Sequence, residues 1–330
     1  MKKFLVIQTA FIGDVVLATG IIEKLHRFYP DAEIDFLVRK GNEGLFLNHP
    51  FLHRLLVWDK KKNKYRNLLW ILKEVRHNNY DVVVNVQRYT STGFITVFSG
   101  ARSTIGFNKN PWSFLFHKRI KHRVTKGKNI VHEIERNNDL IKHLTDGKPE
   151  RPRLYPSMQD YEKVKRYKQN PYVCIAPTSV WFTKQYPKEK WIEHINLLPR
   201  DLQIYLIGAK SDIALCEEIK SLSKHPFITN LAGEMSFLES AALQQKAVMN
   251  YVNDSAPMHF ASAMNAPVTA VYCSTVLEFG YGPLSDRSVV VQSTVPLDCK
   301  PCGIHGYMAC PLGHFKCAYT IKEDQLLETL

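Results

Sequence analysis

The chain has 330 residues, of which 45% are hydrophobic and 23% are charged, so it is too apolar for a disordered protein and too long for one ordinary core. Its net charge of +13 is unevenly spread: residues 1–158 hold 28 Lys/Arg and 14 Asp/Glu, whereas residues 159–330 hold 16 and 17. No stretch approaches the roughly 18 apolar residues that span a bilayer and no signal peptide is recognised, so we expect a cytoplasmic protein whose cysteines are reduced.

Short apolar runs separated by helix-length stretches organise the first half of the chain. The runs cover residues 4–7, 34–38, 55–58 and 82–86. Buried strands of parallel sheets have this continuous apolar character, and helices connect them. We therefore predict a parallel α/β domain over residues 1–158, with its first helix beginning near Val15.

A proline-rich segment interrupts this rhythm, because Pro149, Pro152 and Pro156 fall too close together for a helix to continue. The same alternation then restarts, which predicts a second α/β domain over residues 159–330. Its strands are expected at 173–176, 204–207, 247–252 and 268–272, with a less regular one at 227–231, and its helices include 188–198 and 211–222. Two such domains are expected to place their strand ends around a shared ligand-binding cleft.

Gly13 and Asp14 follow the first predicted strand. Gly13 permits a tight turn, and Asp14 is expected at a helix N-terminus beside the ligand-binding edge, where it serves either as a catalytic base or as an ordinary N-cap. The loop lacks G-x-G-x-x-G, so it carries no dinucleotide-binding fingerprint.

The loop over residues 177–187 follows the first strand of the second half. It offers the hydroxyls of Thr178, Ser179 and Thr183 and the cation of Lys184. Hydroxyls, backbone N–H groups and one Lys at a strand end are suited to cradle phosphates, although an ordinary strand-to-helix loop has the same composition. It is not a Walker A loop.

A second polar segment, Asn253-Asp254-Ser255, follows a strand and opens a helix that runs to Met264. Asp254 or Ser255 is expected to cap this helix and to leave backbone N–H groups directed at a phosphate or a sugar hydroxyl. His259 lies about one turn further, where a lone histidine more often packs than reacts.

These motifs, together with Trp191 and the segment 233–236, occur in an order that resembles the lipopolysaccharide heptosyltransferases of glycosyltransferase family 9. The resemblance covers nearly the whole chain. It implies a GT-B fold, with two Rossmann-like domains facing across a cleft. It also implies an inverting, metal-independent transfer, without a cofactor, from ADP-heptose to the acidic inner core of lipopolysaccharide. The enzyme would then contact the cytoplasmic face of the inner membrane peripherally.

Residue roles follow from the same resemblance, position by position. Asp14 matches the general base and Lys184 the cation that stabilises the departing diphosphate. The donor would contact Thr178, Ser179, Thr183, Asp212, Met235, Ser236, Asp254, Ser255 and His259. The acceptor would contact Gly13, and Arg88 and Arg102 near strand ends are further candidates to bind its anionic groups.

Two alternatives remain open. Thr178, Ala256 and Asn265 stand where relatives often have glycine, so another nucleotide sugar is a possible donor. The basic first half is also compatible with nucleic acid, and its densest runs are 60–66 and 118–128, although either is equally compatible with a surface loop. No nucleic-acid-binding motif or aromatic stacking surface is present, so we expect no nucleic acid partner.

The last cysteines have the spacing C-x2-C-x7-C-x6-C. They are Cys299, Cys302, Cys310 and Cys317. Taken alone, this spacing is typical of a tetrahedral zinc site. Similar segments occur in heptosyltransferase II-like members of the family, for which we know of no required metal, and the chain has no D-x-D motif. We therefore predict no metal and keep zinc as the alternative.

Overall fold

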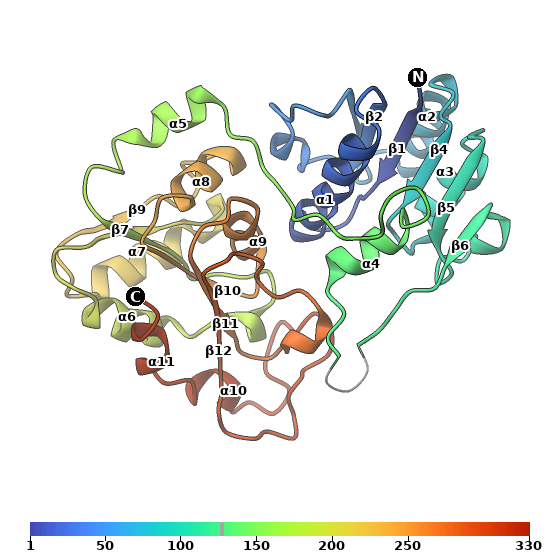
Figure 1. Ribbon diagram of the computed structural model, residues 1–330. Coiled ribbons are helices and arrows are strands. Elements are labelled where there is room, and N and C mark those ends of the chain that lie inside the picture. The colour runs from blue at the N-terminus through green and yellow to red at the C-terminus, as the bar shows by residue number, and fades with distance from the viewer. Residues whose placement is uncertain (126–128) are drawn as a thin grey trace. The chain divides into compact units, whose positions relative to one another are not determined.

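The computed structural model describes residues 1–125 and 129–330, and the chain divides into two compact units, Met1–Tyr155 and Pro156–Leu330 (Figure 1). We call them unit 1 and unit 2. The sequence placed the boundary after residue 158, which is the first residue of α5 (Met158–Lys165). Each unit contains a six-stranded sheet in which every pairing is parallel, and helices connect the strands, so the predicted α/β class is confirmed.

The sheet of unit 1 has the strand order β3-β2-β1-β4-β5-β6. Its strands are β1 (Lys3–Ile7), β2 (Glu33–Arg39), β3 (Arg54–Trp58), β4 (Val82–Asn85), β5 (Ser103–Phe107) and β6 (Lys118–Ile120). Helices α1 (Ile12–Phe28) and α4 (Glu133–Asp139) pack together, as do α2 (Lys64–His77) and α3 (Thr90–Phe98). The central strand β1 is buried from Phe4 to Ile7, as expected for a strand with both faces covered. The four predicted strands are confirmed, whereas β5 and β6 were not predicted.

The sheet of unit 2 has the strand order β12-β11-β10-β7-β8-β9. Its strands are β7 (Tyr172–Ala176), β8 (Gln203–Leu206), β9 (Ile228–Asn230), β10 (Met249–Asn253), β11 (Val268–Tyr272) and β12 (Ser288–Gln292). Its further helices are α6 (Lys188–Leu197), α7 (Ile213–Leu222), α8 (Phe237–Gln244), α9 (Ala256–Ala263), α10 (Lys316–Tyr319) and α11 (Asp324–Leu327). The five strands and two helices predicted here are confirmed, and β12 was not predicted.

Short 3-10 helices lie in the loops. They are η1 (Glu43–Leu45), η2 (Ser113–Leu115), η3 (Phe182–Lys184), η4 (Lys210–Asp212) and η5 (Leu277–Phe279). Within residues 1–125 and 129–330, no helix has both the length and the apolarity that a bilayer crossing requires.

The strand order reverses at one point in each sheet. In unit 1 the reversal lies between β1 and β4, and in unit 2 it lies between β7 and β10. Loops that leave the carboxyl ends of such neighbouring strands diverge to opposite faces of the sheet, and doubly wound folds bind their ligands in the crevice between them. The loops after these four strands are therefore where a site is expected in each unit.

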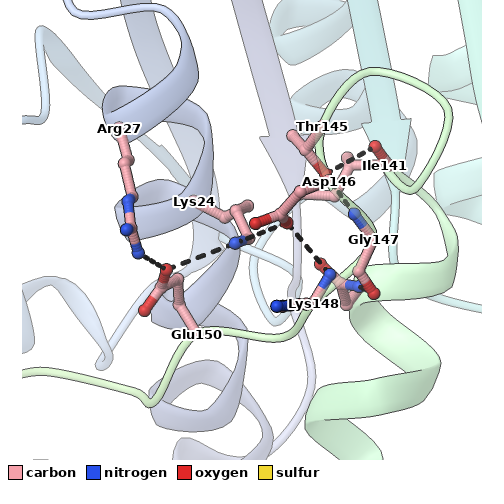
Figure 2. A network of polar contacts seen from close by, with 9 residues as sticks. Lys24, Arg27, Ile141, Thr145, Asp146, Gly147, Lys148 and Glu150 are labelled. Carbon is pink, nitrogen blue, oxygen red and sulfur yellow. Dashed lines mark hydrogen bonds and ion pairs between the residues drawn. The ribbon is translucent and has the colours of Figure 1, made fainter.

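A buried lysine fastens α1 to the segment that ends unit 1 (Figure 2). The side chain of Lys24 is only 1% exposed, and its Nζ lies 2.8 Å from Asp146 Oδ1 and 3.2 Å from Glu150 Oε1. Arg27 adds a second contact to Glu150 at 2.8 Å. Hydrogen bonds from Lys24 and from the Lys148 backbone lower the pKa of Asp146. The network holds the chain against α1 just before it leaves unit 1.

Candidate functional site

A cavity of about 690 Å³ opens at the strand reversal of unit 1, and we call it the strand-end pocket. The loops after β1, β2, β3 and β4 all contribute to its wall. Its charged lining residues are Arg39, Lys40, Asp59, Lys60, Lys61 and Lys62. Five cations against one carboxylate make this a positively charged hollow at the edge where the fold binds ligands.

Lys60 is held in the wall of the strand-end pocket by neutral groups. Its Nζ donates to Thr9 Oγ1 at 2.6 Å and to the Thr9 carbonyl at 3.3 Å, and Thr9 Oγ1 donates onward to Gln87 Oε1 at 2.5 Å. The ammonium also lies 4.6 Å from the centre of the Trp58 ring. Burial, with a smaller contribution from Arg39, lowers the pKa of Lys60 to about 8. The lysine is therefore cationic at neutral pH but titrates just above it.

Asp14 lies in the first turn of α1, three residues after Phe11, and is not itself among the residues that line the pocket. The helix begins at Ile12 and its N-cap residue is Phe11, so the alternative that Asp14 is the N-cap is wrong. Phe11 lines the pocket, and Arg39 stacks over its ring at 5.0 Å. A carboxylate in a first helical turn interacts favourably with the helix dipole. Gly13 is the second residue of this helix and does not form the tight turn expected of it.

Arg88 lies at the carboxyl ends of the strands and Arg102 at their amino ends. Arg88 is exposed and follows β4, between the pocket residues Gln87 and Tyr89. Arg102 precedes β5, is 86% exposed and pairs with Asp81 at 3.3 Å. All strands of this sheet begin at that edge, so Arg102 lies away from the pocket and we remove it from the acceptor site. The sequence showed that Arg102 is close to a strand end without showing which end.

The two basic runs, 60–66 and 118–128, line different cavities of unit 1. Residues 60–62 line the strand-end pocket, and the rest of the first run leads into α2. The second run forms β6 and the wall of another cavity, of about 710 Å³, where Arg123 is paired with Asp139 at 2.5 Å. Residues 126–128 of this run lie outside the described residues. None of the predicted site residues lines the second cavity.

Three neighbouring strands of unit 2 each supply one residue to a polar cluster at their carboxyl ends. Lys184, in η3 after β7, places its Nζ 2.6 Å from Asp254 Oδ2, which follows β10. The hydroxyl of Thr275, after β11, donates to the same Asp254 oxygen at 2.7 Å. All three side chains are largely buried. The structure therefore brings together Lys184 and Asp254, as predicted, and adds Thr275, which the sequence analysis missed.

Asn253 clamps the loop that carries Lys184. Its side chain is fully buried, and its Oδ1 accepts from the Tyr186 backbone N–H at 2.9 Å. Its Nδ2 lies 3.4 Å from the Ala176 carbonyl and 3.3 Å from that of Thr178. The two ends of the loop are thereby tied to β10, while the Thr178 side chain stays half-buried at the strand edge. Ser179 is also half-buried, and its carbonyl accepts from the Gln185 side chain.

The hydroxyl of Thr183 is engaged inside unit 2, and its predicted contact with the donor stays a prediction. It is 1% exposed, and its Oγ1 accepts from the Tyr307 N–H at 2.8 Å and from Ser274 Oγ at 3.1 Å. These bonds hold the cysteine-containing segment against η3. Gly306 of that segment has a φ of +80°, and a Cβ there would lie 2.9 Å from Thr183 Oγ1 and 3.1 Å from Lys184 Cγ. Only glycine fits this approach, so the segment supports the position of Lys184.

Asp212 and Ser236 organise helix N-termini. Asp212 Oδ2 accepts from the Ala209 N–H at 2.7 Å, at the turn between β8 and α7. Ser236 is the N-cap of α8 and exchanges hydrogen bonds with Glu239, at 2.8 Å and 3.1 Å. Both residues lie in loops at the carboxyl ends of strands, where they were predicted, but these contacts belong to the fold.

The N-terminus of α9 has no side-chain cap. Ser255 occupies the N-cap position, yet it makes no capping hydrogen bond, and Asp254 is engaged with Lys184. The expectation that one of them caps the helix is therefore wrong. His259 is buried one turn inside α9, and Met235 packs at the margin of the apolar cluster on one face of the sheet. Pro257 has no backbone N–H and the Met258 N–H donates to the Ser255 carbonyl at 3.1 Å, so this terminus offers few backbone donors beside the Lys184–Asp254 pair.

The four late cysteines do not form a metal-ligand set. Among the residues that the structure describes, no three His, Cys, Asp or Glu side chains are grouped so that they could hold a metal ion. The Cys302 thiol donates to the Cys299 carbonyl at 3.2 Å, and Cys310 Sγ accepts from the Phe315 N–H at 3.4 Å. Burial is the main cause that raises the pKa of Cys317 to about 11. The zinc alternative therefore gains no support here.

Comparisons with known proteins agree on one family. Residues 69–306, more than half of the chain, match the family described as glycosyltransferase family 9 (heptosyltransferase). The lipopolysaccharide heptosyltransferase 3 of Escherichia coli is 29% identical over 283 residues, which cover 80% of this chain and 82% of that protein.

Two solved structures resemble the whole chain. A family 9 glycosyltransferase from Veillonella parvula DSM 2008 gives a TM-score of 0.87 at 18% identity and covers 99% of this chain and 96% of its own. The E. coli ADP-heptose lipopolysaccharide heptosyltransferase II gives 0.80 at 21% identity, covering 100% and 97%. These likenesses show the GT-B fold, with two Rossmann-like domains. The chain belongs to glycosyltransferase family 9 and is a heptosyltransferase.

Proposed function

We propose that unit 2 binds ADP-heptose and that unit 1 binds the anionic inner core of lipopolysaccharide, to which the heptose is transferred. The observation that carries this proposal is the strand-end pocket, where five cations face one carboxylate directly before the helix that bears Asp14. Phosphates and carboxylates are the groups that such a pocket attracts. ADP-heptose is named in the description of the similar heptosyltransferase II, which supports this donor.

The proposed reaction is a single inverting displacement. The acceptor hydroxyl attacks the anomeric carbon while the bond from that carbon to the diphosphate oxygen breaks through an oxocarbenium-like state. Asp14 takes the proton of the hydroxyl as general base. Lys184 offsets the charge that develops on the departing ADP.

In the proposed donor site of unit 2, Lys184 is held in place by its neighbours. Asp254 and Thr275 fix the ammonium from one side, and Asn253 and Gly306 fix its loop from two others. A preorganised cation needs no rearrangement when the diphosphate leaves. We propose that this takes the place of a divalent ion, in keeping with a sequence that has no D-x-D motif.

The proposed acceptor is a glycolipid, so the enzyme would work at the cytoplasmic face of the inner membrane through peripheral contact. No part of the proposal involves nucleic acid. Salt-sensitive binding of generic RNA at physiological ionic strength would argue for that alternative instead.

Isothermal titration with ADP, ADP-heptose, UDP and UDP-glucose, with and without EDTA, tests the donor. We expect the ADP ligands to bind more tightly and EDTA to have no effect. Preference for UDP ligands would keep the transferase family but replace the donor. A loss of binding in EDTA would overturn the metal-independent mechanism.

A further inference from the structure

One face of α2 exposes large apolar side chains to solvent. Tyr65 is 76% exposed, Leu69 60% and Trp70 53%. Residues three or four apart are neighbours on a helix surface, so Leu69 lies beside Tyr65, and Trp70 is joined to them through the exposed Arg66 and Lys73 in one broad stripe. On the opposite side, Ile71 and Val75 are fully buried and pack in the core of unit 1. The stripe is therefore not required for the fold of α2.

The same face of α2 is positively charged. Arg66 and Lys73 are exposed between the apolar residues, and Lys64 begins the helix. The one carboxylate of α2, Glu74, follows Trp70 by one turn and borders this face, and it lies 3.8 Å from Arg54. Apolar and basic side chains are thus interleaved on α2. Since Tyr65 and Trp70 are among them, the expectation that the basic residues have no aromatic side chains interleaved with them is wrong for this helix.

The exposed surface continues onto α3, which packs beside α2. Arg76 Nη1, on α2, donates to the carbonyl of Phe98 at 3.0 Å. The Phe98 ring is 40% exposed and is held 4.8 Å from Phe94 and 5.8 Å from Trp112. We call Tyr65, Arg66, Leu69, Trp70, Lys73 and Phe98 the α2 face.

We propose that the α2 face docks unit 1 on an anionic lipid bilayer. Helices that lie in a membrane interface combine exposed Trp and Leu with Lys and Arg, because the apolar groups enter the acyl boundary while the cations meet anionic headgroups. The charge complementarity selects an anionic surface over a neutral one. Exposed leucines of unit 2, such as Leu197, lie in a half of the chain with no positive excess.

The α2 face follows the strand-end pocket closely along the chain, so docking would bring the bilayer near the pocket. Lys61 and Lys62 line the pocket, and α2 begins two residues later at Lys64. A bilayer bound by the α2 face would therefore lie next to the entrance through which a lipid-anchored acceptor presents its saccharide. The inference rests on the proposed function in this respect, since it assumes that the acceptor is membrane-bound.

Vesicle flotation tests the proposal. The full chain should bind phosphatidylcholine vesicles that contain phosphatidylglycerol, bind pure phosphatidylcholine much less, and lose binding at high salt. The double variant L69S/W70S should bind at least about tenfold more weakly. The variant R66Q/K73Q should lose about fivefold per charge on the anionic vesicles. The control L197S, which removes an exposed leucine from unit 2, should bind like the wild type.

Two outcomes would overturn the docking surface. One is L69S/W70S binding anionic vesicles as tightly as the wild type. The other is a change in oligomeric state for this variant, measured by sedimentation, with unchanged vesicle binding, which would make the α2 face a contact between copies of the chain. Circular dichroism on both variants shows that the fold is retained.

A second readout separates this proposal from the proposed function. Heptose transfer to a delipidated, water-soluble acceptor should be the same for L69S/W70S and wild type, whereas transfer to vesicle-embedded acceptor should fall with the loss of binding. If the wild type transfers heptose but does not bind vesicles, the proposed docking surface is wrong and the proposed function stands. If the wild type binds vesicles but does not transfer heptose from ADP-heptose, the proposed function is wrong and the docking surface stands.

Discussion

The two strand-end sites differ in the groups that surround their lysines. In unit 1, Lys60 is held by the neutral oxygens of Thr9, and a single carboxylate offsets five cations around the pocket. In unit 2, Lys184 is already in an ion pair with Asp254. A cation held by neutral groups keeps its field for a ligand, whereas a paired cation is well positioned but largely offset. The first site is suited to attract an anion, and the second to align one.

Removal of Asp14 should have the largest effect, because Asp14 is the proposed general base and belongs to neither charge arrangement. We expect Asp14→Asn to lower kcat by about 100- to 10,000-fold, since general-base catalysis is typically worth that much. Steady-state transfer kinetics measure the loss, and calorimetry should show unchanged ADP affinity. A proportionate fall in nucleotide binding would instead make Asp14 structural.

Removal of the paired cation should come next in size. We expect Lys184→Met to lower kcat by about 100- to 1,000-fold, because the cation proposed to stabilise the leaving diphosphate is lost and Asp254 keeps a buried charge without its partner. The matched control is Lys188→Met, which removes a lysine of α6 that is paired with Glu218 away from the cluster. Similar losses in both variants would mean that general charge, and not the Lys184 position, matters.

The pocket cation should impose a pH dependence on the acceptor side alone. In the proposed acceptor site the charged form of Lys60 would bind the anion, so binding should be complete below its pKa of about 8 and weaken as the pH rises through it. We expect kcat/KM for the acceptor to fall about tenfold from pH 7 to pH 9, since this ratio reports groups of the free enzyme. Lys60→Arg should remove the fall, because arginine stays charged. A fall that persists in Lys60→Arg would assign it to another group.

The smallest expected effect concerns Thr275. Thr275→Val removes the hydroxyl that donates to Asp254 Oδ2 at 2.7 Å and leaves a side chain of similar shape. One such bond is worth about 1 kcal/mol, so we expect kcat/KM for the donor to fall about fivefold. Thr275→Ser, which retains the hydroxyl, should recover most of it. Equal losses in the two variants would point to packing of the methyl group.

Strands were predictable from sequence where burial on both faces makes a continuous apolar run, as in β1 and β11. The short β6, Lys118–Ile120, has two charged residues and partial exposure, so no apolar run marked it. β5 was missed because Ser103 and Gly106 interrupt its apolar residues. Such strands are defined by their neighbours in the sheet, which local composition does not report.

The site was predictable only where a residue adjoins a recognisable strand end. Lys184 and Asp254 were found in this way, and the structure pairs them. Thr275 carries no signal, because a hydroxyl after a buried strand is common and only the neighbouring positions of β10 and β11 give it a partner. Thr183 shows the converse, since its hydroxyl is used by a segment more than a hundred residues later.

The central claim is that unit 2 binds the nucleotide sugar and unit 1 the anionic acceptor. The most direct test is calorimetry of ADP-heptose binding to wild type, Lys184→Met and Lys60→Ala. The account predicts that Lys184→Met weakens binding by about tenfold or more, as expected for a lost charge-assisted contact, while Lys60→Ala binds like the wild type. Equal weakening in both variants, or weakening in Lys60→Ala alone, would contradict it.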